Sequence, residues 1–247
     1  MRTTLLLLFG VLVSPQAWAV VWRADLNDPP AEQTGHFRSA GRLSYTPLQV
    51  FGGSCVWIKE RWVLTARHAV AAWKPAALTV DFPGSGKQRY DVKSIYLPLD
   101  KQVDLAIIEL SDVPELDKPL PLLKEKLTKD QQIKFGGYGL FGPAGTKQGL
   151  NRFHWGENEI DSANGKIARF SLSKPPAGLP NEATVAFFDS GSPVFCEVEG
   201  KPHLAGIIIR ATGAGAPNYG DQATLTCLFE HVEWIRDVTA EEKKSDR

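Results

Sequence analysis

The chain has 247 residues and carries 28 Lys and Arg against 28 Asp and Glu, which gives a formal net charge of +0 at pH 7. Because nucleic-acid binding needs a basic face, this balance argues against a nucleic-acid partner. The sequence also contains no motif for a metal, a nucleotide or another cofactor, and we expect none to be bound.

Residues 1–19 have the pattern of a secretory signal peptide. Arg2 supplies the positive charge, an apolar segment covers residues 5–13, and the small residues Ala17 and Ala19 mark a cleavage site. We predict cleavage after Ala19, a mature chain that begins at Val20, and a secreted or periplasmic location. The apolar segment is too short to span a bilayer, and no other stretch reaches the required length.

Short apolar runs separated by Gly- and Pro-rich turns make up most of the remaining chain, which is typical of an all-β protein. Because no long helices lie between them, these strands favour sandwiches or barrels over a parallel α/β sheet. A Pro- and Lys-rich stretch over residues 115–132 divides them into two series. We predict strands at residues 51–58, 62–65, 78–81, 92–96 and 105–110, and then at 133–138, 168–172, 194–198, 204–209 and 223–228.

One helix is predicted near the end of the chain, from about residue 230 to residue 243. Val232, Ile235 and Val238 recur there at helical spacing, and charged residues fill the opposite face.

The three cysteines are an odd number for an exported protein, so at most one intramolecular disulfide can form. A pair between Cys196 and Cys227 stays open at this stage, with Cys55 left over.

A candidate nucleophile lies in the stretch of residues 187–195. Its Asp-Ser-Gly-Ser-Pro core stands between a Gly/Pro-rich loop and an apolar strand, and small residues there let the backbone turn sharply and expose one hydroxyl. Ser192 precedes Pro193 and begins the next strand, so we favour Ser190 over Ser192 and over Asp189. Serine is common in turns, and Ser190 alone therefore carries little weight.

Two upstream residues could serve this hydroxyl as base and anion. His68 follows the strand predicted at residues 62–65, and Asp104 begins the strand predicted at 105–110. Taken singly, His68 is explained as an interior histidine and Asp104 as a turn residue at a strand start. A carboxylate next to a fully apolar strand nevertheless needs a partner. Together the three residues have the chemistry of a serine nucleophile, its base and an orienting carboxylate.

The order of these residues along the chain discriminates between folds. An α/β-hydrolase runs Ser, Asp, His, whereas the order His, Asp, Ser is that of the chymotrypsin-type arrangement. The chain resembles the chymotrypsin-like (trypsin-like) serine peptidases, closest to the short secreted bacterial members, from about residue 41 to residue 238. The resemblance rests on GGS at 52–54, WVLTARH at 62–68, DLA at 104–106, FGGYG at 135–139, DSGSP at 189–193, AGI at 205–207 and VEWI at 232–235.

The resemblance implies two packed antiparallel six-stranded β-barrels and a C-terminal α-helix. The first barrel would cover about residues 20–120 and the second about residues 121–247. It also implies a secreted serine endopeptidase that acts on a protein or peptide from the cleft between the barrels. His68 would take the proton of Ser190, Ser190 would attack the scissile carbonyl, and Asp104 would fix the imidazole tautomer.

Further positions carry over from the family. The backbone N–H groups of Phe188 and Ser190 would form the oxyanion hole. Asp189 would support the oxyanion loop by pairing with a buried cation, for which the α-amino group of Val20 is the candidate. The specificity pocket would have Thr184 at its base and Ala211 and Ala223 on its walls. Because none of these residues is charged, the resemblance implies a preference for a small or apolar uncharged side chain directly before the cleaved bond.

Two departures from the family suggest weakened activity. Phe188 stands in place of a glycine and can hold its peptide flipped, and the loss of one oxyanion donor costs roughly 10²–10³ in rate. Ile209 replaces a serine that supports the aspartate, so we expect fewer partners and a raised pKa for Asp104. Two alternatives therefore stay open: an impaired member that binds another protein through Phe187 and Phe188, and an esterase with the same triad.

Overall fold

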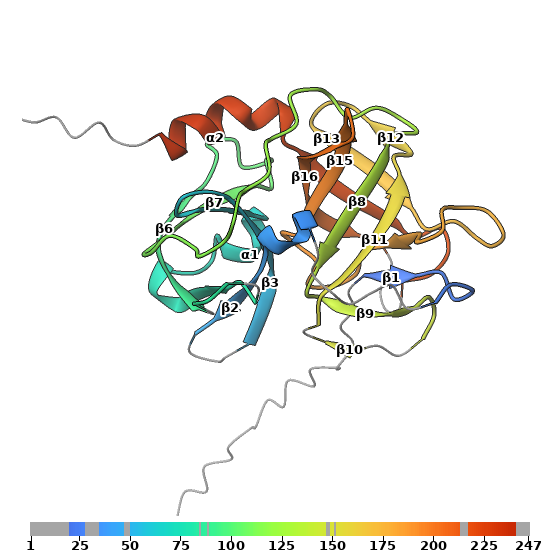
Figure 1. Ribbon diagram of the computed structural model, residues 1–247, viewed down its shortest axis with the longest axis horizontal. Coiled ribbons are helices and arrows are strands. Elements are labelled where there is room, and N and C mark those ends of the chain that lie inside the picture. Colours follow the sequence, from blue (N-terminus) through green and yellow to red (C-terminus); the bar gives the residue numbers. More distant parts are fainter. Residues whose placement is uncertain are drawn as a thin grey trace, which may run out of the picture.

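The computed structural model describes residues 20–27, 35–46, 50–83, 85–87, 89–146, 149–150, 152–212 and 217–240. The predicted signal peptide lies outside these residues. The described chain is almost entirely β, with two halves side by side and the helix α2 (Val232–Thr239) along one edge (Figure 1). The predicted all-β fold with a C-terminal helix is therefore confirmed.

The first half is a closed barrel of six antiparallel strands. Fully buried aliphatic side chains such as Leu43, Val63 and Ile108 fill its interior. The strand order is β2 (Ala40–Tyr45), β3 (Val50–Lys59), β4 (Trp62–Thr65), β7 (Ala106–Leu110), β6 (Arg89–Tyr96) and β5 (Leu78–Asp81).

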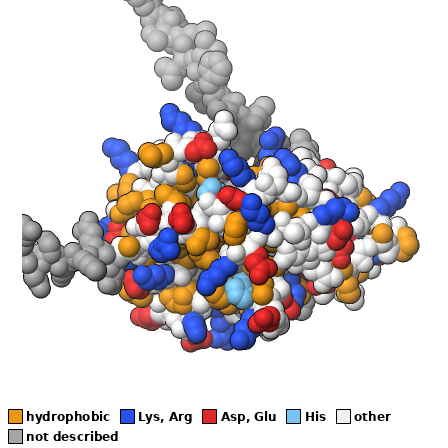
Figure 2. Space-filling view, turned by 90° about the horizontal axis from the view of Figure 1, so that it is seen from above, with side chains coloured by type: hydrophobic (Ala, Val, Ile, Leu, Met, Phe, Trp, Pro, Cys, Tyr) orange, Lys and Arg blue, Asp and Glu red, His pale blue; other side chains and the backbone are white. Residues whose placement is uncertain are grey.

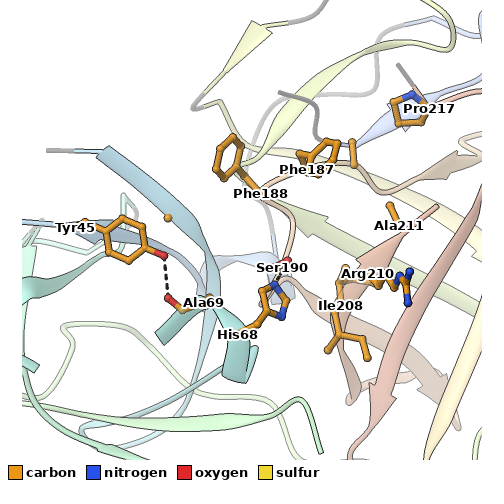
Figure 3. Close-up of a pocket in the computed structure, with 13 residues that line it drawn as sticks. Tyr45, His68, Ala69, Phe187, Phe188, Ser190, Ile208, Arg210, Ala211 and Pro217 are labelled. Carbon is orange, nitrogen blue, oxygen red and sulfur yellow. Dashed lines mark hydrogen bonds between the residues drawn. The ribbon is translucent and has the colours of Figure 1, made fainter. Parts of the chain in front are cut away.

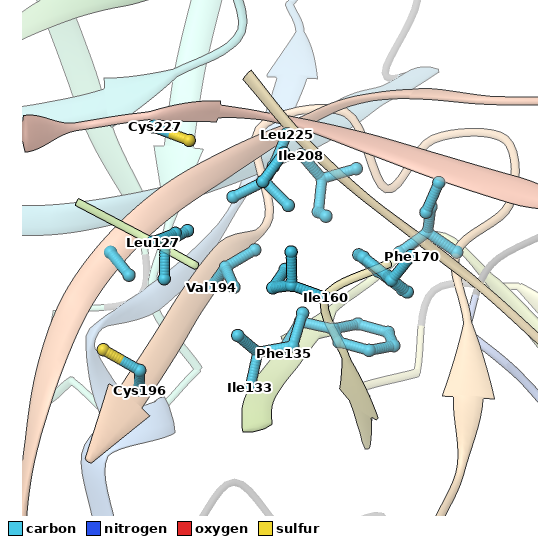
Figure 4. Packing of buried hydrophobic residues seen from close by; sticks show 14 of the residues in the cluster. Leu127, Ile133, Phe135, Ile160, Phe170, Val194, Cys196, Ile208, Leu225 and Cys227 are labelled. Atoms are coloured by element: carbon cyan, nitrogen blue, oxygen red, sulfur yellow. The ribbon is translucent and has the colours of Figure 1, made fainter. Parts of the chain in front are cut away.

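The second half is a half-barrel of seven antiparallel strands, where six in a closed barrel were expected. Its core packs Phe135, Phe170, Val194 and Leu225 against one another (Figure 4). The strand order is β11 (His154–Glu159), β8 (Gln132–Gly137), β15 (Pro193–Val198), β16 (Lys201–Ala211), β17 (Gln222–Cys227), β13 (Ile167–Ser171) and β12 (Ser162–Ala163).

A small four-stranded sheet beside the half-barrel contains the first described residues of the chain. Its order is β10 (Gly149–Leu150), β9 (Leu140–Pro143), β1 (Val21–Trp22) and β14 (Ala183–Thr184). The domain boundary expected at residue 20 needs correction here, because β1 belongs to the second half, as Figure 1 shows. The reason is apolar burial: Val20 and Val21 are fully buried in clusters built from second-half side chains.

The hydrophobic pattern did not reveal strand β11. Its inward-facing residues are His154, Gly156 and Asn158, which alternate as a strand requires but are not apolar. His154 stacks on Phe141, at 3.9 Å between ring centroids, and on Trp22, at 5.6 Å. Burial, with a smaller effect of Arg152, lowers the pKa of His154 to about 4. The ring is therefore uncharged at neutral pH, and through its two stacking contacts it links β11 to β1 and β9.

Short helical segments complete the fold. The one-turn helix α1 (Arg67–Val70) follows β4, and the single 3₁₀ turns are η1 (Gly35–Ser39), η2 (Pro75–Ala77) and η3 (Phe229–His231). The helix predicted from about residue 230 is present as α2, which follows η3 and begins two residues later than predicted. Residues 241–243 of the prediction lie outside the described residues. Ile235 of α2 is buried in an apolar cluster that also contains Leu64, Leu105, Phe195 and Ile207. This cluster joins the two halves and so fixes their relative position.

The three cysteines are buried free thiols. Cys196 is on β15 and Cys227 on β17, and β16 lies between these two strands (Figure 4). Strands two apart in a sheet are about 10 Å from each other, beyond the Cα separation of about 4.4–6.8 Å that a disulfide spans. The pair that the sequence left open is therefore not formed.

Surface charge is evenly mixed on the face that Figure 2 presents, where basic and acidic side chains alternate among apolar ones. In the described part of the chain, no helix combines the length and the hydropathy that crossing a membrane would require.

Candidate active site

His68 and Asp104 are brought together by the pairing of two strands. Strands β4 and β7 run antiparallel, and the last residue of β4, Thr65, pairs with the first residue of β7, Ala106. The end of one strand and the start of the other therefore lie side by side at one rim of the barrel. His68 lies just beyond this rim in α1, and Asp104 just before it, although 36 positions separate them in sequence.

Ser190 completes a continuous set of hydrogen bonds. His68 Nε2 lies 2.7 Å from Ser190 Oγ, as Figure 3 shows. On the other side of the ring, His68 Nδ1 lies 2.7 Å from Asp104 Oδ2. The backbone N–H of His68 also donates to Asp104 Oδ1 at 3.0 Å. Both distances at the imidazole are within ordinary hydrogen-bonding range. The structure thus brings together the three residues that the sequence singled out, from both halves of the molecule.

The expected rise in the pKa of Asp104 is wrong. Burial does raise the pKa, but the hydrogen bond from the His68 ring and the backbone N–H groups of His68 and Arg67 outweigh burial and lower it below the ordinary value. These donors come from the same barrel as Asp104. Its backbone oxygen also accepts the Thr226 hydroxyl at 3.2 Å.

Arg67, which the sequence analysis did not single out, binds the loop that leads to Asp104. Its guanidinium donates to the backbone oxygens of Pro98, at 2.9 Å, and Asp100, at 3.3 Å, in the loop that leads to Asp104. The only hint in the sequence was its position directly before His68.

The turn that carries Ser190 is held against the first barrel. The backbone N–H of Ser54 donates to Ser190 O at 2.8 Å. Gly191 has φ +90°, and a Cβ at this position would lie 1.9 Å from Ser54 O and 2.3 Å from Thr65 Oγ1. Only glycine fits this close approach, so the Ser-Gly pair in the sequence has a steric reason.

Phe188 adopts a left-handed backbone conformation with φ +68°. This conformation costs a non-glycine residue about 1–2 kcal/mol. Packing compensates part of this cost, because the Phe188 ring lies 5.8 Å from that of Phe51. Among the described residues, neither the Phe188 N–H nor the Ser190 N–H donates to a protein acceptor.

Asp189 is completely buried beside this turn. Its Oδ2 accepts the Ala186 N–H at 3.2 Å, whereas its Oδ1 accepts no hydrogen bond among the described residues. Burial raises the pKa of Asp189 well above its ordinary value, although the backbone N–H groups of Ala186 and Gly139 and the Ser192 side chain lower it in part. A carboxylate in this position needs a cation or a proton.

A cavity of about 450 Å³ opens beside His68 and Ser190 (Figure 3). Of the three predicted pocket residues, Ala211 lines this cavity, whereas Thr184 and Ala223 are buried side chains outside its lining. The sequence analysis missed Phe187, Arg210 and Pro217 as lining residues. Phe187 lies close to Ser190 in the sequence and Arg210 directly follows the strand predicted at 204–209, whereas no sequence pattern pointed to Pro217.

A search of the curated proteins finds no match to this chain. Within the described ranges, no group of three or more His, Cys, Asp or Glu side chains could hold a metal ion. The Trypsin family model matches residues 31–235, which is most of the chain. The arrangement of a closed six-stranded barrel, a half-barrel and a terminal helix agrees with this match. The chain therefore belongs to the trypsin family, the chymotrypsin-like serine peptidases.

Proposed function

We propose that this protein is an active, secreted serine endopeptidase that hydrolyses peptide bonds through an acyl-enzyme. The observation that carries the proposal is the unbroken hydrogen-bonded path from Asp104 through His68 to Ser190. Membership of the family implies a protein or peptide substrate.

In the proposed reaction, Ser190 Oγ attacks the scissile carbonyl carbon while His68 Nε2 takes its proton. Asp104 accepts from Nδ1–H and stabilises the imidazolium. The tetrahedral oxyanion then accepts hydrogen bonds from the N–H groups of Phe188 and Ser190, which have no protein acceptor among the described residues. When the C–N bond breaks, His68 gives its proton to the leaving amine, and water repeats the sequence to release the acid and restore Ser190.

The lining of the cavity supports a preference for a small or apolar uncharged side chain before the cleaved bond. Ala186, Ile208 and Ala211 line it, and none of its lining residues is a carboxylate that would pair with a basic side chain. Peptides with Ala, Val or Leu at this position are expected to be cleaved at least about tenfold faster than peptides with Arg or Lys, as kcat/KM. A tenfold preference for Arg would overturn this assignment.

We further propose that removal of residues 1–19 frees an α-amino group that pairs with Asp189. Val21 pairs with Thr184 and Trp22 with Ala183, so that one further step in this antiparallel register would bring Val20 opposite Val185. Ala186, the next residue, donates its N–H to Asp189. A new ammonium group at Val20 would thus arise beside a buried carboxylate whose Oδ1 lacks a partner among the described residues.

Labelling with a fluorophosphonate tests the main proposal, because an activated serine displaces fluoride and keeps the phosphonyl group. The chain beginning at Val20 is expected to form a one-to-one adduct, seen by intact mass and assigned to Ser190 by peptide mapping. Ser190→Ala and His68→Ala are expected to form none. If the chain remains unlabelled under conditions that label trypsin, the protein-binding alternative replaces this proposal; the observation that favours it is Phe187, which is 53% exposed beside the cavity.

The same labelling tests the role of Val20. A chain extended by Ala19 lacks the ammonium group at Val20 and is expected to label at least about tenfold more slowly, since it leaves Asp189 unpaired. An extension of the C-terminus by one alanine is the matched control. Equal labelling rates for the chain that begins at Val20 and the chain extended by Ala19 would refute the pairing of Val20 with Asp189. The proposed roles of Ser190, His68 and Asp104 would not be affected.

A further inference from the structure

Arg210 stands out in the cavity beside Ser190 because it is a permanent cation in an otherwise apolar wall. It lies on β16 and is exposed, and its side chain lines the same cavity as His68 and Ser190. In the part of the chain that the structure describes, it forms no salt bridge to any carboxylate. A guanidinium keeps its charge at any pH at which proteins fold.

Most of the other residues that line the cavity are uncharged and apolar. Ala186, Phe187, Ile208, Ile209, Ala211 and Pro217 contribute uncharged side chains to its lining. Ion pairs gain strength where apolar groups exclude water, and planar guanidinium groups bind carboxylates through two parallel hydrogen bonds. A substrate that fills this cavity would therefore gain most from a carboxylate side chain within reach of Arg210.

An irregularity in β16 gives Arg210 this position. The register between β16 and β17 shifts between Ile208 and Arg210, so that Arg210 pairs with Thr224 and Ala211 with Ala223. Such a bulge interrupts the alternation of side chains and re-aims those that follow it. Ile208 is buried in the core and only borders the cavity, whereas Arg210 is exposed there.

The position of His68 decides which part of a substrate faces Arg210. His68 belongs to the first barrel, and its Nε2, 2.7 Å from Ser190 Oγ, must reach the leaving amine. The part of the substrate after the cleaved bond therefore lies toward the first barrel, and the part before it lies toward β16. In Figure 3 the guanidinium end of Arg210 lies away from His68 and Ser190, below Ala211. A carboxylate that it meets is therefore expected on a residue further from the cleaved bond.

We propose that Arg210 makes this enzyme selective for substrates with Asp or Glu two to four residues before the cleaved bond. The proposal rests on the proposed peptidase function and names a substrate class for the same site. It is compatible with an uncharged residue directly before the cleaved bond, because the two side chains occupy different parts of the site.

The test uses quenched-fluorescent peptides that differ only in carrying Glu, Gln or Lys at one of these three positions. At one position, wild-type enzyme is expected to cleave the Glu peptide about tenfold faster than the Gln peptide, as kcat/KM at low salt. The preference should shrink as salt is added, because the pair is partly exposed. The Arg210→Gln variant should cleave the Glu and Gln peptides with equal kcat/KM. The Arg210→Glu variant should cleave the Lys peptide faster than the Glu peptide.

For each variant, the measured quantity is the ratio of kcat/KM for the Glu peptide to kcat/KM for the Gln peptide. Differences between variants in folding or in the active fraction cancel in this ratio. Arg38→Gln is the matched control, because it removes an exposed positive charge outside the cavity and should keep the wild-type ratio. Equal cleavage of Glu and Gln peptides by wild-type enzyme at all three positions would overturn the role of Arg210 and leave the peptidase proposal standing. If no peptide is cleaved and no adduct forms on Ser190, the peptidase proposal fails and this inference fails with it.

Discussion

Replacing Ser190 with alanine is expected to lower kcat/KM for a cleavable peptide by about 10⁶-fold. The variant lacks the oxygen that forms the acyl-enzyme, and only binding and the oxyanion donors remain to assist water. His68→Ala should cost a similar factor, because Ser190 Oγ then loses the base that lies 2.7 Å away. Since the two act as one unit, the double variant should be no slower than either single variant.

The matched control is Ser192→Ala, two positions further along the same turn. The Ser192 side chain is completely buried, and its hydroxyl makes no hydrogen bond to His68, although it does interact with Asp189. This variant should keep activity within about tenfold of wild type, the range of an ordinary buried substitution. If instead Ser192→Ala were inactive and Ser190→Ala active, the nucleophile would have been assigned to the wrong serine.

Asp104→Asn is expected to lower kcat by about 10⁴-fold, with little change in KM. The amide keeps the shape of the carboxylate but does not stabilise the imidazolium, and its NH₂ group favours the wrong tautomer of His68. Because the pKa of Asp104 is lowered, the stabilisation from its bond to His68 is complete above the ordinary carboxylate pKa of about 3.9. It is lost only as pH falls through the lowered value.

Steady-state kinetics and thermal unfolding together check this prediction. Asp117→Asn serves as the control, since Asp117 is an exposed partner of Arg38 and should leave kcat unchanged. A loss of less than about tenfold in a folded Asp104→Asn variant would mean that the carboxylate does not orient His68, whatever its distance.

Much of the candidate site was predictable because its signals are local. The strand ending before His68, the acid before an apolar strand and the Ser-Gly turn each follow from a few adjacent residues. Apolar runs such as residues 62–65 and 105–110 became β4 and β7 within one residue, because their side chains are buried whichever strands they pair with. Strand β11 was not predicted, because its core-facing residues are His154, Gly156 and Asn158, which do not form an apolar pattern.

By itself, therefore, the sequence determined the strand-rich class, the terminal helix, the family and the three residues of the hydrogen-bonded path, since each depends on local pattern and chain order. Only the tertiary structure decided that β1 joins the second half, that Cys196 and Cys227 are separated by β16, and that the pKa of Asp104 is lowered. It alone also showed Arg210 in the cavity beside Ser190. These facts depend on which distant segments meet, and that is settled by the packing of the whole core, not by any one segment of the chain.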